Sequence, residues 1–496
     1  MELLYRSTRS DQRRVRASEA ILKGLAEDGG LFVPESVPVL DRSLREFSGM
    51  SYQDTAYEVM KLFLTDFTEE ELRGCIERAY DSKFDTGVIA PLHYADGAYF
   101  LELYHGATIA FKDMALSILP HLMTTAARKN HVTDEIVILT ATSGDTGKAA
   151  LAGFAGVPGT KIIVFYPKDG VSSIQEKQMV TQKGDNAWVV GIRGNFDDAQ
   201  NGVKEIFGDT HLADVMRQSG LRFSSANSIN IGRLVPQIVY YVYACAKLLK
   251  AGRIEDGQTV NVVVPTGNFG NILAAYYAKL AGAPIGKLIC ASNENKVLYD
   301  FFQTGDYDRN REFILTASPS MDILISSNLE RLIYRIAGND PVRTAGLMKD
   351  LAEKGTYTIT LEMKERLADF AGGYATQERA ALVIRRLYEQ DGYVIDPHTA
   401  VAAAVYEDYR AASGDDAACV IASTASPYKF PRSVMEAMGE ACGGMTDFDL
   451  IERLSDLSRT PVPRAIEEIR TAPVLHTRVC GRDEMKKTVE EILGLS

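Results

Sequence analysis

The sequence predicts an α/β protein with two doubly wound, mainly parallel sheets and a helical N-terminal domain. Short β-branched runs alternate with helical segments from about residue 130 onward, a pattern typical of parallel sheets that are covered on both faces. These units form two clusters, about 130–225 and 260–430, and so indicate two α/β domains with a cleft between them. The length of 496 residues agrees, because a single hydrophobic core rarely serves so long a chain.

Five consecutive parts of the chain follow from this division. They are a mainly helical N-terminal domain (1–90), a segment of the large domain (91–130), a small α/β domain (131–225), the large α/β domain (226–432) and a helical tail (433–496). A helical insertion is expected within the large domain at about 340–390.

Local signals place the individual elements. In the first part, Ser18 and Gly24 bound a predicted helix, and a Gly-Gly turn leads into a short strand that ends at Pro34. Apolar runs then predict strands at 136–140, 161–166, 188–192, 260–264, 288–291 and 418–422. Intervening segments predict helices at 147–155, 174–182 and 197–207, and a further helix that ends at Lys279.

Composition excludes several classes of function. The chain has 54 basic and 66 acidic residues, and its formal charge of −12 disfavours nucleic acid or an anionic membrane as a partner. The six cysteines are scattered without a Cys-x-x-Cys pair, as expected of reduced core thiols in a cytoplasmic protein. We find no run of about 18 apolar residues and no apolar leader region, so neither a membrane span nor a signal peptide is expected.

Residues 105–116 contain a single lysine, Lys112, within a run of apolar and small residues. Desolvation lowers the pKa of a lysine toward the range in which its amine is a nucleophile. Such an amine can form a Schiff base with an aldehyde cofactor. The alternative is a lysine on a helix surface, with its stem buried and its ammonium in water.

A glycine-rich turn follows the strand at 260–264. Gly267, Asn268, Phe269, Gly270 and Asn271 join this strand to a helix. Glycines allow the backbone to approach an anion closely, and the start of the helix offers free N–H groups, so a phosphate is the expected ligand. The alternative is a tight turn without a ligand.

The strand at 136–140 ends in a similar turn. Ser143, Thr146 and several N–H groups of this turn could hold a carboxylate. The turn does not fit the nucleotide-binding Walker pattern, because that pattern requires glycine at position 142 and Ser or Thr at 149, where this chain has Thr142 and Ala149.

Two further segments carry polar groups. Asn227, Ser228 and Arg233 precede or begin an apolar helix, where amide, hydroxyl and guanidinium donors could bind a second phosphate. The alternative is a capped helix with a surface arginine. Thr424 follows the strand at 418–422, at the sheet edge where parallel strands present ligand contacts, although it could equally be a plain turn hydroxyl.

Taken together and in this order, the five segments resemble the long threonine synthases, which are fold-type-II pyridoxal-phosphate enzymes with a tryptophan-synthase-β-like fold. The resemblance covers most of the chain and includes further segments at 5–9, at 24–34, at 318–323 with 326–328, and at 396–400. It implies pyridoxal 5'-phosphate as the cofactor, no metal, and a mainly helical N-terminal domain.

The resemblance also implies roles for individual residues. By motif, Lys112 corresponds to the Schiff-base lysine, and Thr424 to the hydroxyl that faces the pyridine nitrogen. The cofactor phosphate would be held by Gly267, Asn268, Phe269, Gly270 and Asn271. The substrate carboxylate would be held by Ser143, Gly144, Asp145 and Thr146, and the substrate phosphate by Asn227, Ser228 and Arg233.

The chain departs from the family pattern at three positions. Ala107 stands where proline is common, which removes no chemistry. Ser426 replaces a usual histidine, so any role of that imidazole is absent or moved. Asp145 stands where related enzymes have asparagine, and because a carboxylate cannot donate a hydrogen bond, the contact to the phenolic oxygen of the cofactor stays unassigned.

The resemblance implies conversion of O-phospho-L-homoserine and water to L-threonine and phosphate by γ-elimination and β-addition, in the cytoplasm. A phospho-amino-acid lyase or a serine/threonine dehydratase of the same fold is the alternative, because such enzymes share the lysine and the phosphate turn. A non-catalytic relative is a third hypothesis, although it would be expected to have lost one of these features. Monomer and homodimer both stay open.

Overall fold

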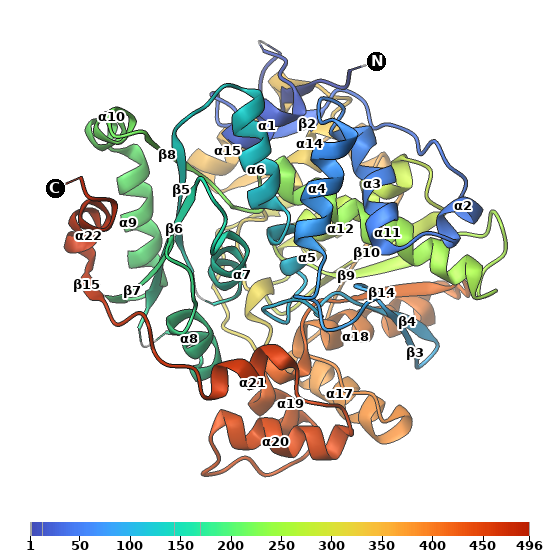
Figure 1. The fold of residues 1–496 in the computed structure, drawn as a ribbon. Helices are drawn as coiled ribbons and strands as arrows, with labels where there is room; N and C mark the ends of the chain where they lie inside the picture. The colour runs from blue at the N-terminus through green and yellow to red at the C-terminus, as the bar shows by residue number, and fades with distance from the viewer. Residues whose placement is uncertain (1, 12, 143, 169, 496) are drawn as a thin grey trace.

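Two separate sheets organise the protein, in a computed structural model that describes residues 2–11, 13–142, 144–168 and 170–495. The five-stranded sheet is parallel, in the order β15-β7-β6-β5-β8. The six-stranded sheet has the order β13-β10-β9-β14-β4-β3; β3 runs antiparallel to β4, and the other pairs are parallel. This arrangement confirms the predicted fold class (Figure 1).

The strands have the following bounds. The small sheet contains β5 (Glu135–Ala141), β6 (Thr160–Pro167), β7 (Ala187–Arg193), β8 (Leu221–Ser224) and β15 (Val479–Gly481). The large sheet contains β3 (Leu92–Ala95), β4 (Ala98–Glu102), β9 (Val260–Pro265), β10 (Ile285–Ser292), β13 (Phe370–Tyr374) and β14 (Cys419–Ser423). Two small antiparallel pairs lie outside both sheets: β1 (Tyr5–Ser7) with β2 (Phe32–Pro34), and β11 (Asp306–Asp308) with β12 (Thr356–Thr358).

The helices fall into four groups along the chain. The N-terminal group is α1 (Ala17–Lys23), α2 (Leu44–Ser48), α3 (Tyr52–Phe63) and α4 (Glu69–Ala79). The next is α5 (Asp113–Leu116), α6 (Leu119–Lys129), α7 (Asp145–Phe154), α8 (Ser173–Val180), α9 (Phe196–Gly208) and α10 (Thr210–Gln218). The large-domain group is α11 (Ile231–Lys250), α12 (Gly270–Leu280), α13 (Val297–Thr304), α14 (Leu329–Ile336), α15 (Pro341–Lys354), α16 (Leu361–Glu365), α17 (Gln377–Asp391) and α18 (Pro397–Ser413). The last is α19 (Pro431–Ala437), α20 (Asp447–Ser458), α21 (Arg464–Arg470) and α22 (Met485–Leu493).

Helices cover both faces of each sheet, which is why the central strands are mostly apolar and largely buried. Every residue of β9 is buried. One continuous core joins the N-terminal helices, α11, α12 and the inner faces of both sheets, and α2 and α3 pack directly on α11. A second core lies between the large sheet and α17 to α21, and a third between the small sheet, α9 and α22. The N-terminal helices are therefore part of the body of the protein.

The structure corrects two of the expected elements. The stretch 340–390 contains β12 and β13 as well as helices, and β13 is an edge strand of the large sheet. The tail after 432 is also not purely helical: it returns from α21 to the small domain, where β15 pairs with β7 and α22 packs on α9 (Figure 1). The edge strands β13 and β15 were missed because edge strands are short and need no continuous apolar run. β13 contains Gly372 and Gly373, and β15 has only three residues.

Candidate active site

A cavity of about 370 Å³ lies between the carboxyl ends of the strands of the two domains. It brings together most of the residues singled out in the sequence. These are Lys112, Asp145, Thr146, Asn227, Ser228, Arg233, Gly267, Asn268, Phe269, Gly270, Asn271 and Thr424. Gly144 is the N-cap residue of α7 and is not among the residues that line the cavity. Ser143 lies outside the described residues.

Lys112 reaches this cavity from the turn before α5. Two backbone links fasten the turn to the end of β14: Ala110 forms a β-bridge with Ala425, and the Phe111 N–H donates to the Thr424 carbonyl at 2.8 Å. The Lys112 side chain is buried, and this burial lowers its pKa; the Asp145 carboxylate opposes the shift, whereas the cations of Lys429 and Arg233 add to it. The alternative of a solvated surface lysine is therefore wrong.

Asp145 lies between the amine nitrogens of two lysines. Its Oδ1 atom is 3.0 Å from Lys429 Nζ, and its Oδ2 atom is 3.5 Å from Lys112 Nζ. Burial alone would raise the pKa of Asp145, but Lys429 and then Lys112 hold it far below its usual range. Asp145 is thus an ionised acceptor in this cavity, and Gln175 of α8 also donates to it at 3.2 Å.

Sequence reasoning missed three polar residues around Lys112. Ser320 Oγ lies 3.1 Å from Lys112 Nζ, in a 3-10 turn at Pro319–Met321. His398, in the first turn of α18, accepts from the Ser320 N–H at 3.2 Å, and Asp396 accepts from His398 Nδ1 at 2.6 Å. The motifs at 318–323 and 396–400 were noted as part of the resemblance, but their spacing carried no indication of a role. Lys429 was missed as well, although it follows Thr424 by five residues.

The turn after β9 is shaped to receive an anion. A Cβ atom on Gly267 would lie 2.3 Å from the Ser320 carbonyl, so glycine is required for this close approach. Phe269 has the left-handed conformation (φ 63°) and is the N-cap residue of α12. Asn271 Oδ1 accepts from Tyr240 and Tyr241, at 2.8 and 2.5 Å, whereas its buried Nδ2 has no partner among the described residues. A free buried donor beside helix N–H groups fits a phosphate.

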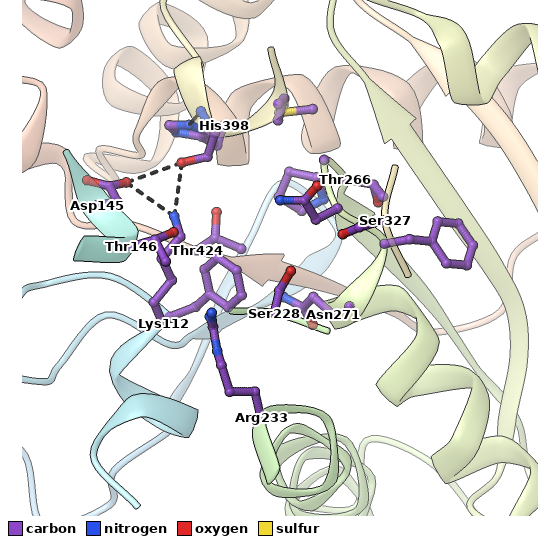
Figure 2. A pocket seen from close by; sticks show the side chains of 18 of the residues that line it. Lys112, Asp145, Thr146, Ser228, Arg233, Thr266, Asn271, Ser327, His398 and Thr424 are labelled. Atoms are coloured by element: carbon purple, nitrogen blue, oxygen red, sulfur yellow. Dashed lines mark hydrogen bonds and ion pairs between the residues drawn. The ribbon is translucent and has the colours of Figure 1, made fainter. Parts of the chain in front are cut away.

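A second candidate position for an anion lies at the start of α11. Arg233 is 3% exposed, and burial lowers its pKa to about 10. Its Nη1 donates to the Ala226 carbonyl at 3.1 Å, while its buried Nε has no partner among the described residues. Figure 2 shows the guanidinium rising from α11 toward Ser228 and Lys112. The alternative of a surface arginine is therefore wrong, and a buried cation without an acidic partner in the described part of the chain favours an anionic ligand.

Thr424 lies at the end of β14, where it lines the cavity. Its N–H donates to Thr399 Oγ1 at 3.3 Å, and Thr399 Oγ1 in turn donates to Asp396. Ser426, the residue in place of the family histidine, accepts from the Tyr428 N–H at 3.3 Å and caps a short 3-10 turn. The imidazole in this cavity belongs instead to His398.

Comparison with known families and proteins gives matches along nearly the whole chain. Family models described as threonine synthase N terminus, pyridoxal-phosphate dependent enzyme and threonine synthase C-terminal match residues 4–80, 90–424 and 399–479. The chain is 40% identical to threonine synthase-like 1 of Homo sapiens, over 96% of this chain and 66% of that protein, so it spans slightly less than two thirds of that relative. It is 35% identical to threonine synthase of Saccharomyces cerevisiae, over 92% of this chain and 93% of that protein.

Comparison with solved structures gives the same result as comparison of sequences. The crystal structure of pyridoxal-phosphate-bound threonine synthase from Brucella melitensis superposes with a TM-score of 0.86 at 34% identity, and the alignment covers 100% of this chain and 99% of that one.

Proposed function

This chain belongs to the threonine synthase family of pyridoxal-phosphate-dependent enzymes, and we propose that it converts O-phospho-L-homoserine and water to L-threonine and phosphate. The observation that carries the proposal is one cavity that a buried lysine shares with two candidate anion positions, each with a buried donor that has no partner among the described residues. A substrate with its own phosphate requires the second position in addition to the one for the cofactor.

The residues of the cavity fit pyridoxal 5'-phosphate and this substrate. When bound, the cofactor supplies an aldehyde to react with amines and a ring that stores an electron pair. Its phosphate would be held by the turn at 267–271. Thr424 would face the pyridine nitrogen, and a neutral hydroxyl there would leave the ring a weaker electron sink than a carboxylate would.

The chain itself contributes binding, orientation and proton transfer. Lys112 is the base in this proposal: its amine lines the cavity, and burial lowers its pKa, which favours the form that can take a proton from the substrate and return it. Arg233, Asn227 and Ser228 would hold the substrate phosphate, and the N–H groups of the turn at 143–146 would hold its carboxylate. Because the Asp145 side chain is an ionised acceptor, it would orient donors, and only the backbone N–H of this residue would contact that carboxylate.

Incubation with O-phosphohomoserine tests the proposal when released phosphate and threonine are followed together. Equal release of both supports threonine synthesis. Phosphate accompanied by 2-oxobutyrate would support a phospho-amino-acid lyase instead, which is the alternative within the same fold. Parallel assays with serine and threonine detect a dehydratase. Absence of any turnover, with the cofactor bound, would favour a non-catalytic relative.

We also propose a cytoplasmic location, and a monomer or a homodimer as the active form. All six cysteines are buried free thiols, the state expected in a reducing compartment. None of the helices in the described ranges is long and apolar enough to cross a bilayer.

A further inference from the structure

Two oxygen atoms face the amine of Lys112. Ser320 Oγ lies 3.1 Å from Nζ, and Asp145 Oδ2 lies 3.5 Å from it. The same Ser320 hydroxyl donates its hydrogen to Asp145 Oδ2 at 3.2 Å. A serine hydroxyl has one hydrogen and an ionised carboxylate has none, so both oxygens can only accept from the lysine.

This geometry fixes the direction of the lysine lone pair. A neutral amine has two N–H bonds and one lone pair. If its two N–H bonds are directed to Ser320 and Asp145, the lone pair points away from both of these oxygens. We propose that Ser320 is a positioning residue that aims the Lys112 lone pair at the aldehyde carbon of the cofactor, a role that rests on the proposed function.

A histidine and an aspartate hold Ser320 in place. The Ser320 N–H donates to His398 Nε2 at 3.2 Å, and His398 Nδ1 lies 2.6 Å from Asp396 Oδ2. Since the backbone N–H only donates and the carboxylate only accepts, His398 carries its proton on Nδ1. Asp396 is fully buried and caps α18, so this tautomer is anchored to a rigid helix.

The glycine turn supports Ser320 from the other side. The Ser320 carbonyl lies where a Cβ atom on Gly267 would be, at 2.3 Å. The 3-10 turn that carries Ser320 is thus packed between His398 and the turn proposed to hold the cofactor phosphate. A residue held from two sides, with its hydroxyl directed at the nucleophile, suits orientation of that nucleophile.

Removal of the Ser320 hydroxyl distinguishes two possible effects on cofactor capture: the orientation of the Lys112 amine and the fraction of that amine that is neutral. The hydroxyl accepts a hydrogen bond from the ammonium form of Lys112, so its loss disfavours that form and lowers the lysine pKa further. The Ser320→Ala variant therefore has more neutral amine at neutral pH. If only the amount of neutral amine mattered, this variant would capture the cofactor faster than the wild type. Under our proposal it captures the cofactor more slowly.

The experiment uses the full-length protein freed of cofactor, with two measurements. The first is the pH dependence of Lys112 acylation by acetic anhydride, followed by mass spectrometry. The second is the rate of pyridoxal phosphate capture, followed by absorbance. We expect Ser320→Ala to shift the acylation midpoint to lower pH and to slow capture about tenfold, the scale of one lost orienting hydrogen bond.

Further variants separate positioning from damage to the fold. Ser320→Thr retains a hydroxyl and should keep more of the capture rate than Ser320→Ala. His398→Gln retains an acceptor for the Ser320 N–H and should lose less of the rate than His398→Leu. Ser458→Ala is the matched control, because Ser458 is also buried but lies on α20, in a hydrogen-bond cluster with Thr460.

Two results would overturn the proposal, and they differ in what else they affect. If the wild type captures pyridoxal phosphate and Ser320→Ala captures it as fast or faster, the positioning role is wrong and the proposed function stands. If the wild type captures none, the proposed function fails and this role fails with it.

Discussion

Lys429 Nζ lies 3.0 Å from Asp145 Oδ1, and neither side chain has appreciable contact with solvent (0% and 7% exposed). Lys429 also donates to the Thr108 carbonyl at 2.9 Å, which ties the pair to the turn that carries Lys112. Asp145 belongs to the small domain and Lys429 to the segment after β14, so this ion pair bridges the two sides of the cavity. Of the two lysines, Lys429 contributes more to the low pKa of Asp145.

Lys429→Met should destabilise the fold strongly, because it leaves the Asp145 carboxylate buried without its nearest counter-ion. The expected loss is about 3–5 kcal/mol in the free energy of unfolding. Urea unfolding of the cofactor-free protein measures it. Lys161→Met is the matched control, since Lys161 pairs with the partly exposed Glu135 and should cost under about 1 kcal/mol. Equal losses of unfolding free energy in the two variants would show that the buried ion pair contributes no more to stability than the more exposed pair.

Lys112→Ala should abolish both cofactor attachment and turnover, because no other amine lies in the described part of the cavity lining. Borohydride reduction followed by peptide mapping measures the attachment. Lys148→Ala is the control: Lys148 is also buried, with a pKa lowered to about 7 by burial and by Lys429, but it donates to Gln182 at 2.9 Å and does not line the cavity. Normal turnover by Lys112→Ala would refute the role of this lysine.

Arg233→Ala should reduce selectivity for phosphorylated substrates by roughly 2–3 kcal/mol, the usual contribution of a hydrogen bond to a charged group. The measurement compares kcat/KM for O-phosphohomoserine with that for an unphosphorylated amino acid. Arg222→Ala serves as control, because Arg222 is a partly exposed arginine of β8, 4.0 Å from Asp134. If Arg233→Ala lowered kcat/KM equally for both substrates, the assignment of the second anion position would be wrong.

His105 should make stability depend on pH. Burial alone would lower its pKa, but the carboxylates of Asp85 (2.6 Å) and Glu102 (3.0 Å) outweigh this and raise it from 6.5 to about 9. A raised folded-state pKa stabilises the fold fully below pH 6.5, and this contribution is lost as the pH rises toward 9. Chemical denaturation between pH 6 and 10 should therefore show a decline that His105→Asn largely removes. An unchanged decline in that variant would contradict the prediction.

Most of the central strands were predictable, because burial on both faces favours apolar residues along a central parallel strand. The strands from β5 to β7, together with β9, β10 and β14, lie where the sequence indicated. The edge strands β8, β13 and β15 were not predictable in this way, since one neighbour suffices for an edge strand and no apolar run marks it. β15 also lies more than 280 residues from its partner β7, and no local pattern reports such a pairing.

The sequence by itself determined the two-sheet fold and the chemistry-bearing turns, because glycine spacing, β-branched runs and one lysine among apolar neighbours are local properties. Only the tertiary structure decided which charges meet. Lys429 reaches Asp145 across 284 positions in sequence, and Ser320 reaches Lys112 across 208. The electrostatics of a buried amine depend on neighbours in space, so its surroundings become known only when the segments are packed together.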